Sequence, residues 1–69
     1  METCSYFNGF QEVFFKGELL FSESYPEGGN ERRELYRLPN GNYLAGIRFR
    51  NKADLLTEVK VSENRPTGF

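Results

Sequence analysis

The chain has 69 residues, of which 38% are hydrophobic and 28% charged, and its nine basic and ten acidic side chains nearly cancel. This length allows one domain, and a chain so short buries only about 60% of the surface that it exposes when unfolded. A formal net charge of −1 gives no long-range attraction for nucleic acid or for an anionic membrane surface.

The sequence has one cysteine, Cys4, and no histidine. It cannot form an internal disulfide, so we expect a reducing, cytoplasmic location. No apolar run approaches the roughly 20 residues of a membrane span, and the first residues lack the pattern of a secretion signal. Without histidine, and without a recognisable carboxylate pair or metal-ligand spacing, the sequence predicts no enzyme, no metal and no cofactor.

Residues 1–9 are short and mixed in character. Asn8-Gly9 lies between the aromatic residues Tyr6, Phe7 and Phe10. This pattern fits a tight turn between two short strands, because Asn-Gly accepts the backbone angles of hairpin turns. The favoured interpretation is a loosely held N-terminal strand or arm that packs its rings on the core.

Residues 11–25 show a strong period of two. Val13, Phe15, Leu19, Phe21 and Tyr25 share one parity and polar residues share the other, which indicates strands with one buried face. A hairpin with Lys16-Gly17-Glu18 as its loop is favoured, because strands longer than about ten residues are uncommon. One long strand bent at Gly17 is the alternative.

The segment 26–31 is predicted to be a flexible loop, and a hairpin follows it. Asn40-Gly41 predicts a two-residue type I′ turn between strands at 32–38 and 42–50. Leu38 would then face Tyr43, and Tyr36 would face Ala45. The predicted core face carries Tyr36, Leu38, Tyr43, Ala45, Ile47 and Phe49.

A third strand is predicted to pair with the second across a loop at Asn51-Lys52-Ala53. A three-residue loop aligns Phe49 with Leu55, Ile47 with Thr57, Ala45 with Val59, Tyr43 with Val61, and Arg50 with Asp54. Both faces then hold sensible pairs, which supports the register.

Residues 63–69 are predicted to form a polar tail. The whole chain is predicted to be all-β: a small antiparallel meander of five or six strands, either a curved sheet or an open barrel of SH3-like or OB-like size.

The outer face of this predicted sheet carries two kinds of candidate binding residue. Five are apolar, namely Phe14, Leu20, Leu35, Leu44 and Leu56, and four are basic, namely Arg33, Arg37, Arg48 and Arg50. So many apolar residues on a face expected to contact solvent indicate an interface. The alternative is that the barrel closes, or the N-terminal arm folds back, and hides these residues.

The sequence therefore predicts a non-enzymatic protein–protein interaction module. It would act as an inhibitor, adaptor or regulatory subunit of a larger protein, with self-association into a homodimer as a further expectation. The alternative is a small β-barrel that binds single-stranded nucleic acid through its arginines. Glu34 and Glu58 lie near the arginines in the predicted sheet and weaken that alternative.

Overall fold

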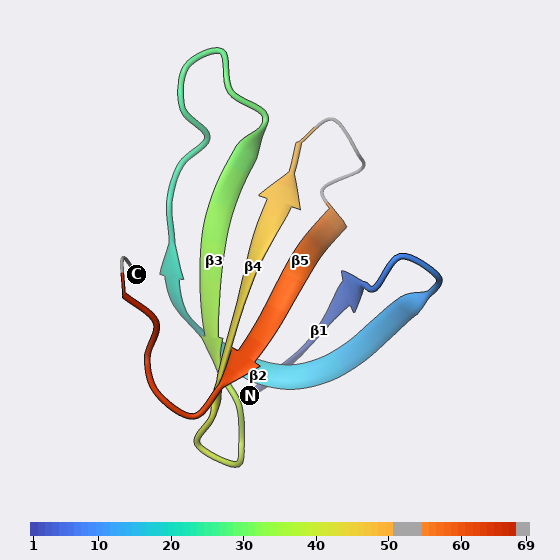
Figure 1. Cartoon of the computed structure of the whole chain (residues 1–69), viewed down its shortest axis with the longest axis vertical. Helices are drawn as coiled ribbons and strands as arrows, with labels where there is room; N and C mark the ends of the chain where they lie inside the picture. Colours follow the sequence, from blue (N-terminus) through green and yellow to red (C-terminus); the bar gives the residue numbers. More distant parts are fainter. Residues whose placement is uncertain (51–54, 68–69) are drawn as a thin grey trace.

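The computed structural model describes residues 1–50 and 55–67, and within them the chain is all-β. Antiparallel strands follow one another in a single meander (Figure 1): β1 (Glu2–Phe7), β2 (Glu12–Ser22), β3 (Glu31–Arg37), β4 (Tyr43–Phe49) and β5 (Leu55–Ser62). The sheet curls into a half-barrel, which confirms the predicted meander. In these described ranges no helix is long and apolar enough to cross a bilayer.

β2 is one long, bent strand, so the favoured hairpin at Lys16-Gly17-Glu18 is wrong and its alternative is right. The first part of β2 pairs with β1, and its last part pairs with β3. Gly17 is the last residue that pairs with β1, directly before the part that pairs with β3. A side chain there would begin 3.2 Å from the Phe15 ring and 3.3 Å from the Arg37 carbonyl oxygen. Glycine thus leaves room for the close approach of β3 to the bend and does not form a turn.

The β3–β4 hairpin has a three-residue loop, so the predicted type I′ turn is wrong. The Leu38 N–H donates to the Asn42 carbonyl at 2.8 Å, and the Gly41 N–H donates to the Leu38 carbonyl at 2.9 Å. In this loop only Gly41 has a positive φ, of 88°. Pro39 fits the first central position of a type I turn, and Gly41 then supplies the left-handed residue that completes the loop.

This loop shifts the pairing by one residue and exchanges the two faces of β4 relative to β3. Tyr36 pairs with Leu44, and Arg37 pairs with Tyr43. The concave core therefore contains Tyr36, Leu44 and Leu56, with Cys4, Tyr6, Phe15, Leu38 and Val59 packed against it. Of the residues predicted for the core face, Tyr43, Ala45, Ile47 and Phe49 lie instead on the convex face, where they are half-buried.

The β4–β5 pairing is as predicted at one end and shifted at the other. Phe49 pairs with Leu55 and Ile47 with Thr57, but Ala45 pairs with Lys60 rather than Val59. The cause is a bulge at Glu58, whose φ is 51°. The bulge turns Val59 toward the core beside Gly46, where an added side chain would begin 2.9 Å from Leu56. The predicted loop at 51–53 and the Arg50–Asp54 pair lie outside the described residues.

The curl of the sheet covers Leu44 and Leu56, two of the apolar residues that were candidates for an interface. β1 and β5 are the two edges of the sheet, and they approach to within 8 Å between Cα atoms, although in the described residues no ladder joins them. Leu35, Leu44 and Leu56 are at most 2% exposed. The half-barrel hides Leu44 and Leu56, as the closure alternative predicted. Leu35 alternates with Glu34 and Tyr36 along β3, so it is buried on the convex side, where it pairs with Phe21 and Ala45.

Candidate protein-binding surface and the buried arginine–glutamate centre

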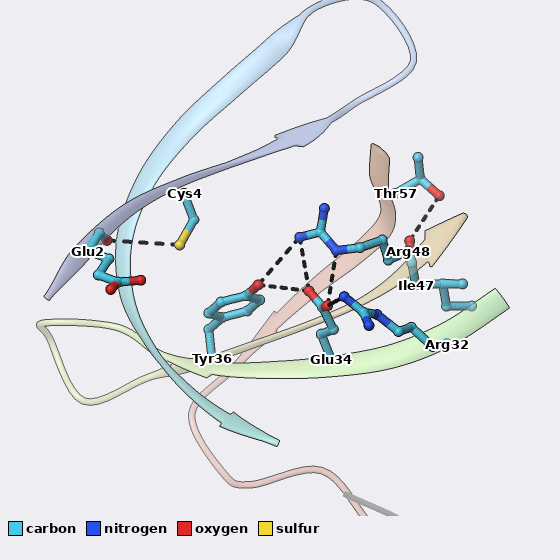
Figure 2. Close-up of polar contacts among 8 residues, drawn as sticks. All are labelled: Glu2, Cys4, Arg32, Glu34, Tyr36, Ile47, Arg48 and Thr57. Carbon is cyan, nitrogen blue, oxygen red and sulfur yellow. Dashed lines mark hydrogen bonds and ion pairs between the residues drawn. The ribbon is translucent and has the colours of Figure 1, made fainter. Parts of the chain in front are cut away.

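A buried carboxylate lies at the centre of the concave face (Figure 2). Glu34 on β3 is 2% exposed, and Arg48 on β4 donates to both of its oxygens, each at 2.9 Å. The Tyr36 hydroxyl donates to the same carboxylate at 2.7 Å. Arg32 makes a further ion pair with it at 3.0 Å. The fork of Arg48 matches the two carboxylate oxygens, which is the strongest geometry for such a pair.

The protonation of this centre follows from its contacts. Burial raises the pKa of Glu34, but hydrogen bonds from Arg48 and Tyr36 outweigh it and hold the pKa below its usual range. Burial and the bond to Glu34 raise the pKa of Tyr36 to about 12. The bond to Glu34 likewise raises the pKa of Arg48. The glutamate is thus ionised and the tyrosine neutral at pH 7, and the carboxylate is occupied by side chains of its own sheet.

Arg32 also contacts Tyr25, in the segment between β2 and β3, and Arg50 joins it there. The guanidinium carbons of Arg32 and Arg50 lie 4.9 Å and 4.3 Å from the centre of the Tyr25 ring. The backbone N–H of Arg50 also donates to the Asn30 carbonyl at 2.8 Å. These cation–π contacts tie the loop to the ends of β3 and β4.

The four arginines predicted to share one face are divided between two, so the predicted arginine stripe is wrong. Arg48 lies on the concave face with Glu34, and Arg50 lies beside Arg32 over Tyr25. Arg33 and Arg37 point to the convex side, because they alternate with Glu34 and Tyr36 along β3. The same one-residue shift at the β3–β4 loop explains the division.

Arg33 is held by Glu23. Its Nε and backbone N–H both bond to one oxygen of Glu23, at 3.1 and 3.0 Å. The hydrogen bond to the Arg33 side chain is the main reason that the pKa of Glu23 is lowered. This exposed pair fixes the segment after β2 against β3.

Of the five predicted apolar residues, Phe14 alone has a largely exposed side chain. It is 67% exposed, Leu20 is half-buried, and Leu35, Leu44 and Leu56 are buried. Phe14 pairs with Ser5, and this register puts it on the convex face of β1–β2, because Cys4 and Phe15 pack into the core. Serine is too small to cover the ring beside it.

A second exposed phenylalanine lies at the turn of the same hairpin. Phe10 is 92% exposed. The Asn8 side-chain oxygen accepts the backbone N–H groups of Phe10 and Gln11, each at 2.9 Å, and Gly9 has a φ of 99°. A glycine at the first central position is the mark of a type II′ turn. The Asn8-Gly9 turn is therefore present, and it holds Phe10 outward on an ordered backbone.

Phe7 extends this surface toward the open side of the half-barrel. It pairs with Glu12 on the convex face, diagonally next to Phe14. It also lines a hollow of about 650 Å³ between the end of β1 and β5, together with Phe49 and Val59. We name Phe7, Phe10 and Phe14 the aromatic hairpin surface. The prediction from sequence included Phe14 and missed the other two, although an aromatic residue directly after Asn-Gly is a signal for a ring at the tip of a turn.

Comparisons with protein-family models, with curated proteins and with solved structures found no match to this chain.

Proposed function

We propose that this protein is a non-enzymatic binding module that docks on a larger protein through the aromatic hairpin surface. The observation that carries the proposal is the 92% exposure of Phe10 on a turn whose backbone is fixed by Asn8. A large ring held outward costs little conformational entropy to bury, and such rings are typical anchors of protein interfaces. Phe14 supplies a second anchor on the same hairpin.

The charges of the hairpin indicate the character of the partner. Glu2, Glu12 and Glu18 lie on β1 and β2 together with one basic residue, Lys16, and all four are exposed. Charges at the edge of an interface steer association more than they add affinity. The partner we infer therefore has an apolar pocket for the rings and a basic surround.

The test compares the wild-type protein with the double variant Phe10→Ser, Phe14→Ser. Val61→Ser is the matched control, because Val61 is 56% exposed but lies on β5, outside the hairpin surface. Proteins captured from the native cell by each form are quantified by mass spectrometry. A partner retained by wild type and control, and lost by the double variant, is purified for calorimetry.

Each anchor should contribute about 2 kcal/mol, so Phe10→Ser should weaken the purified complex about 30-fold. Circular dichroism must show that the variant is folded, as expected for a side chain so exposed. If the captured proteins are the same for all three forms, the hairpin is not the binding surface and the proposal fails.

Nucleic-acid binding stays a second candidate because Arg32 and Arg50 gather around Tyr25. An aromatic ring beside arginines is a common element of single-strand binding surfaces. A titration with oligothymidylate at several salt concentrations distinguishes the two. Phosphate contacts would give a steep salt dependence that Arg50→Gln reduces, whereas the protein-binding proposal expects neither effect.

A further inference from the structure

A cleft on the convex side of the sheet is separate from the aromatic hairpin surface. It has a volume of about 550 Å³ and lies between β4, the end of β5 and the segment 64–67. That segment turns back after β5 (Figure 1), and the Ser62 hydroxyl donates to the Asn64 carbonyl at 2.8 Å within this turn. A volume of this size is in the range of small-molecule sites.

The floor of the cleft is apolar. Ala45 and Ile47 face it from β4, and Pro66 faces it from the returning segment. Ala45 and Ile47 are only half-buried, because the core lies on the opposite face of β4. These surfaces would lose further contact with water if an aliphatic chain lay on them.

A lysine stands directly beside this floor. Lys60 pairs with Ala45 across the β4–β5 ladder, so both side chains share the convex face. The bulge at Glu58 is responsible, since the register found at Ile47 and Thr57 would otherwise put Lys60 opposite Leu44 and inside the half-barrel. The bulge at Glu58 therefore places the Val59 side chain in the core and the Lys60 side chain at the cleft.

The charges around the cleft favour an anion. Arg33, Lys60 and Arg65 line it together with one carboxylate, Glu58. Arg33 is neutralised by Glu23. Among the residues that the structure describes, no acidic group lies within ion-pair distance of the exposed ammonium of Lys60.

We propose that this cleft binds a small amphipathic carboxylate. The aliphatic part of the ligand lies on Ala45, Ile47 and Pro66, and its carboxylate pairs with Lys60. This inference does not depend on the proposed function, because the cleft and the aromatic hairpin surface share no residue.

Octanoate is the probe, with octanol and octylammonium as its uncharged and cationic counterparts. Each is titrated into the ¹⁵N-labelled protein, and amide shifts are followed by NMR. Octanoate should give saturable shifts at Ala45, Ile47 and Lys60, and the other two should bind more weakly. If all three ligands bind alike, or if the shifted amides lie elsewhere, the proposal is overturned.

Two variants complete the test. Lys60→Gln should weaken octanoate binding up to about fivefold, as expected for an exposed ion pair, whereas Lys16→Gln on β2 should leave it unchanged. Ala45→Leu should fill the floor and abolish binding. If Ala45→Leu does not fold, the comparison of Lys60→Gln with Lys16→Gln is the test. The proposal is refuted if Lys60→Gln binds octanoate with the same affinity as wild type.

Discussion

Glu34 is the residue on which the concave centre depends, because its carboxylate pairs with both Arg48 and Arg32. The two ion pairs differ in burial: the Glu34 side chain is 3% exposed, and those of Arg48 and Arg32 are 21% and 30% exposed. Removing one partner of a buried pair is much more costly than removing an exposed one, since the remaining charge has lost its hydration without compensation.

We expect Glu34→Gln to lower the free energy of unfolding by about 3 kcal/mol at pH 7. An amide cannot neutralise the guanidinium of Arg48, and so small a domain has little stability to lose. Urea unfolding followed by circular dichroism gives the value. Glu18→Gln is the control, because Glu18 is exposed on β2, and it should change stability by less than about 0.5 kcal/mol. A Glu34→Gln protein as stable as this control would show that the centre is energetically neutral.

The same residue predicts how stability responds to acid. The pKa of Glu34 in the folded protein lies below its ordinary value of 4.5, so the unfolded chain binds the proton first. Its contribution is complete above pH 4.5 and is lost as pH falls through the lower folded pKa. Wild type should therefore lose stability more steeply than Glu34→Gln between pH 5 and 2.5, a difference read from urea midpoints. Equal slopes would mean that Glu34 is not stabilised as an ion.

At the scale of the elements, the β3–β4 loop determines which residues form the core. Leu38 and Asn42 close this loop, with Pro39, Asn40 and Gly41 between them. Deleting Pro39 would leave Asn40-Gly41 as a two-residue loop closed by the same pair, which is the length that a type I′ turn needs. The register of β3 against β4 would then be unchanged.

We therefore expect the Pro39 deletion to fold with nearly wild-type stability. Gly41→Val is the contrasting variant, because it puts a β-branched side chain at a φ of 88° and should cost about 1–3 kcal/mol. Thermal melts of both proteins measure the difference. A Pro39 deletion that unfolds while Gly41→Val does not would contradict this account of the loop.

Most of the strands were predictable from sequence, although β2 was expected to be a hairpin. The register was predictable only at the Phe49–Leu55 end of the β4–β5 pair. Alternation of apolar and polar residues identified the strands, since the period of two is a local property. The type I′ prediction is wrong because Asn40-Gly41 fits two loop lengths, and Pro39 favours the longer one. The bulge at Glu58 has no local signal, because it depends on the space beside Gly46 across the ladder.

The candidate site was affected by these same errors. A one-residue shift moved Leu44 and Arg48 from the predicted outer face to the concave side. Phe14 was found because the pairing of β2 does not depend on the β3–β4 loop. Glu34 was recognised only as a neighbour of the arginines, since its burial follows from the curl of the sheet, and no local pattern encodes that curl.

At the scale of the whole molecule, the concave core of the half-barrel depends on both the first and the last strand. Cys4 and Tyr6 from β1 pack against the cluster that Tyr36, Leu44 and Leu56 form on β3, β4 and β5. The edges that bring them together are not joined by a ladder in the described residues. The β1–β2 ladder joins β1 to the sheet on one side, and side-chain packing must therefore hold β1 against β5 on the other.

We expect Leu44→Glu to unfold the protein, because a carboxylate at a position 2% exposed would be buried without a partner. Val61→Glu is the matched control: Val61 pairs with Leu44 on the neighbouring strand but is 56% exposed, so this variant should stay folded. Circular dichroism reports the fold, and analytical ultracentrifugation reports the mass. A folded Leu44→Glu protein with reduced self-association would instead identify Leu44 as part of an interface between copies, and would show that the half-barrel does not close over it.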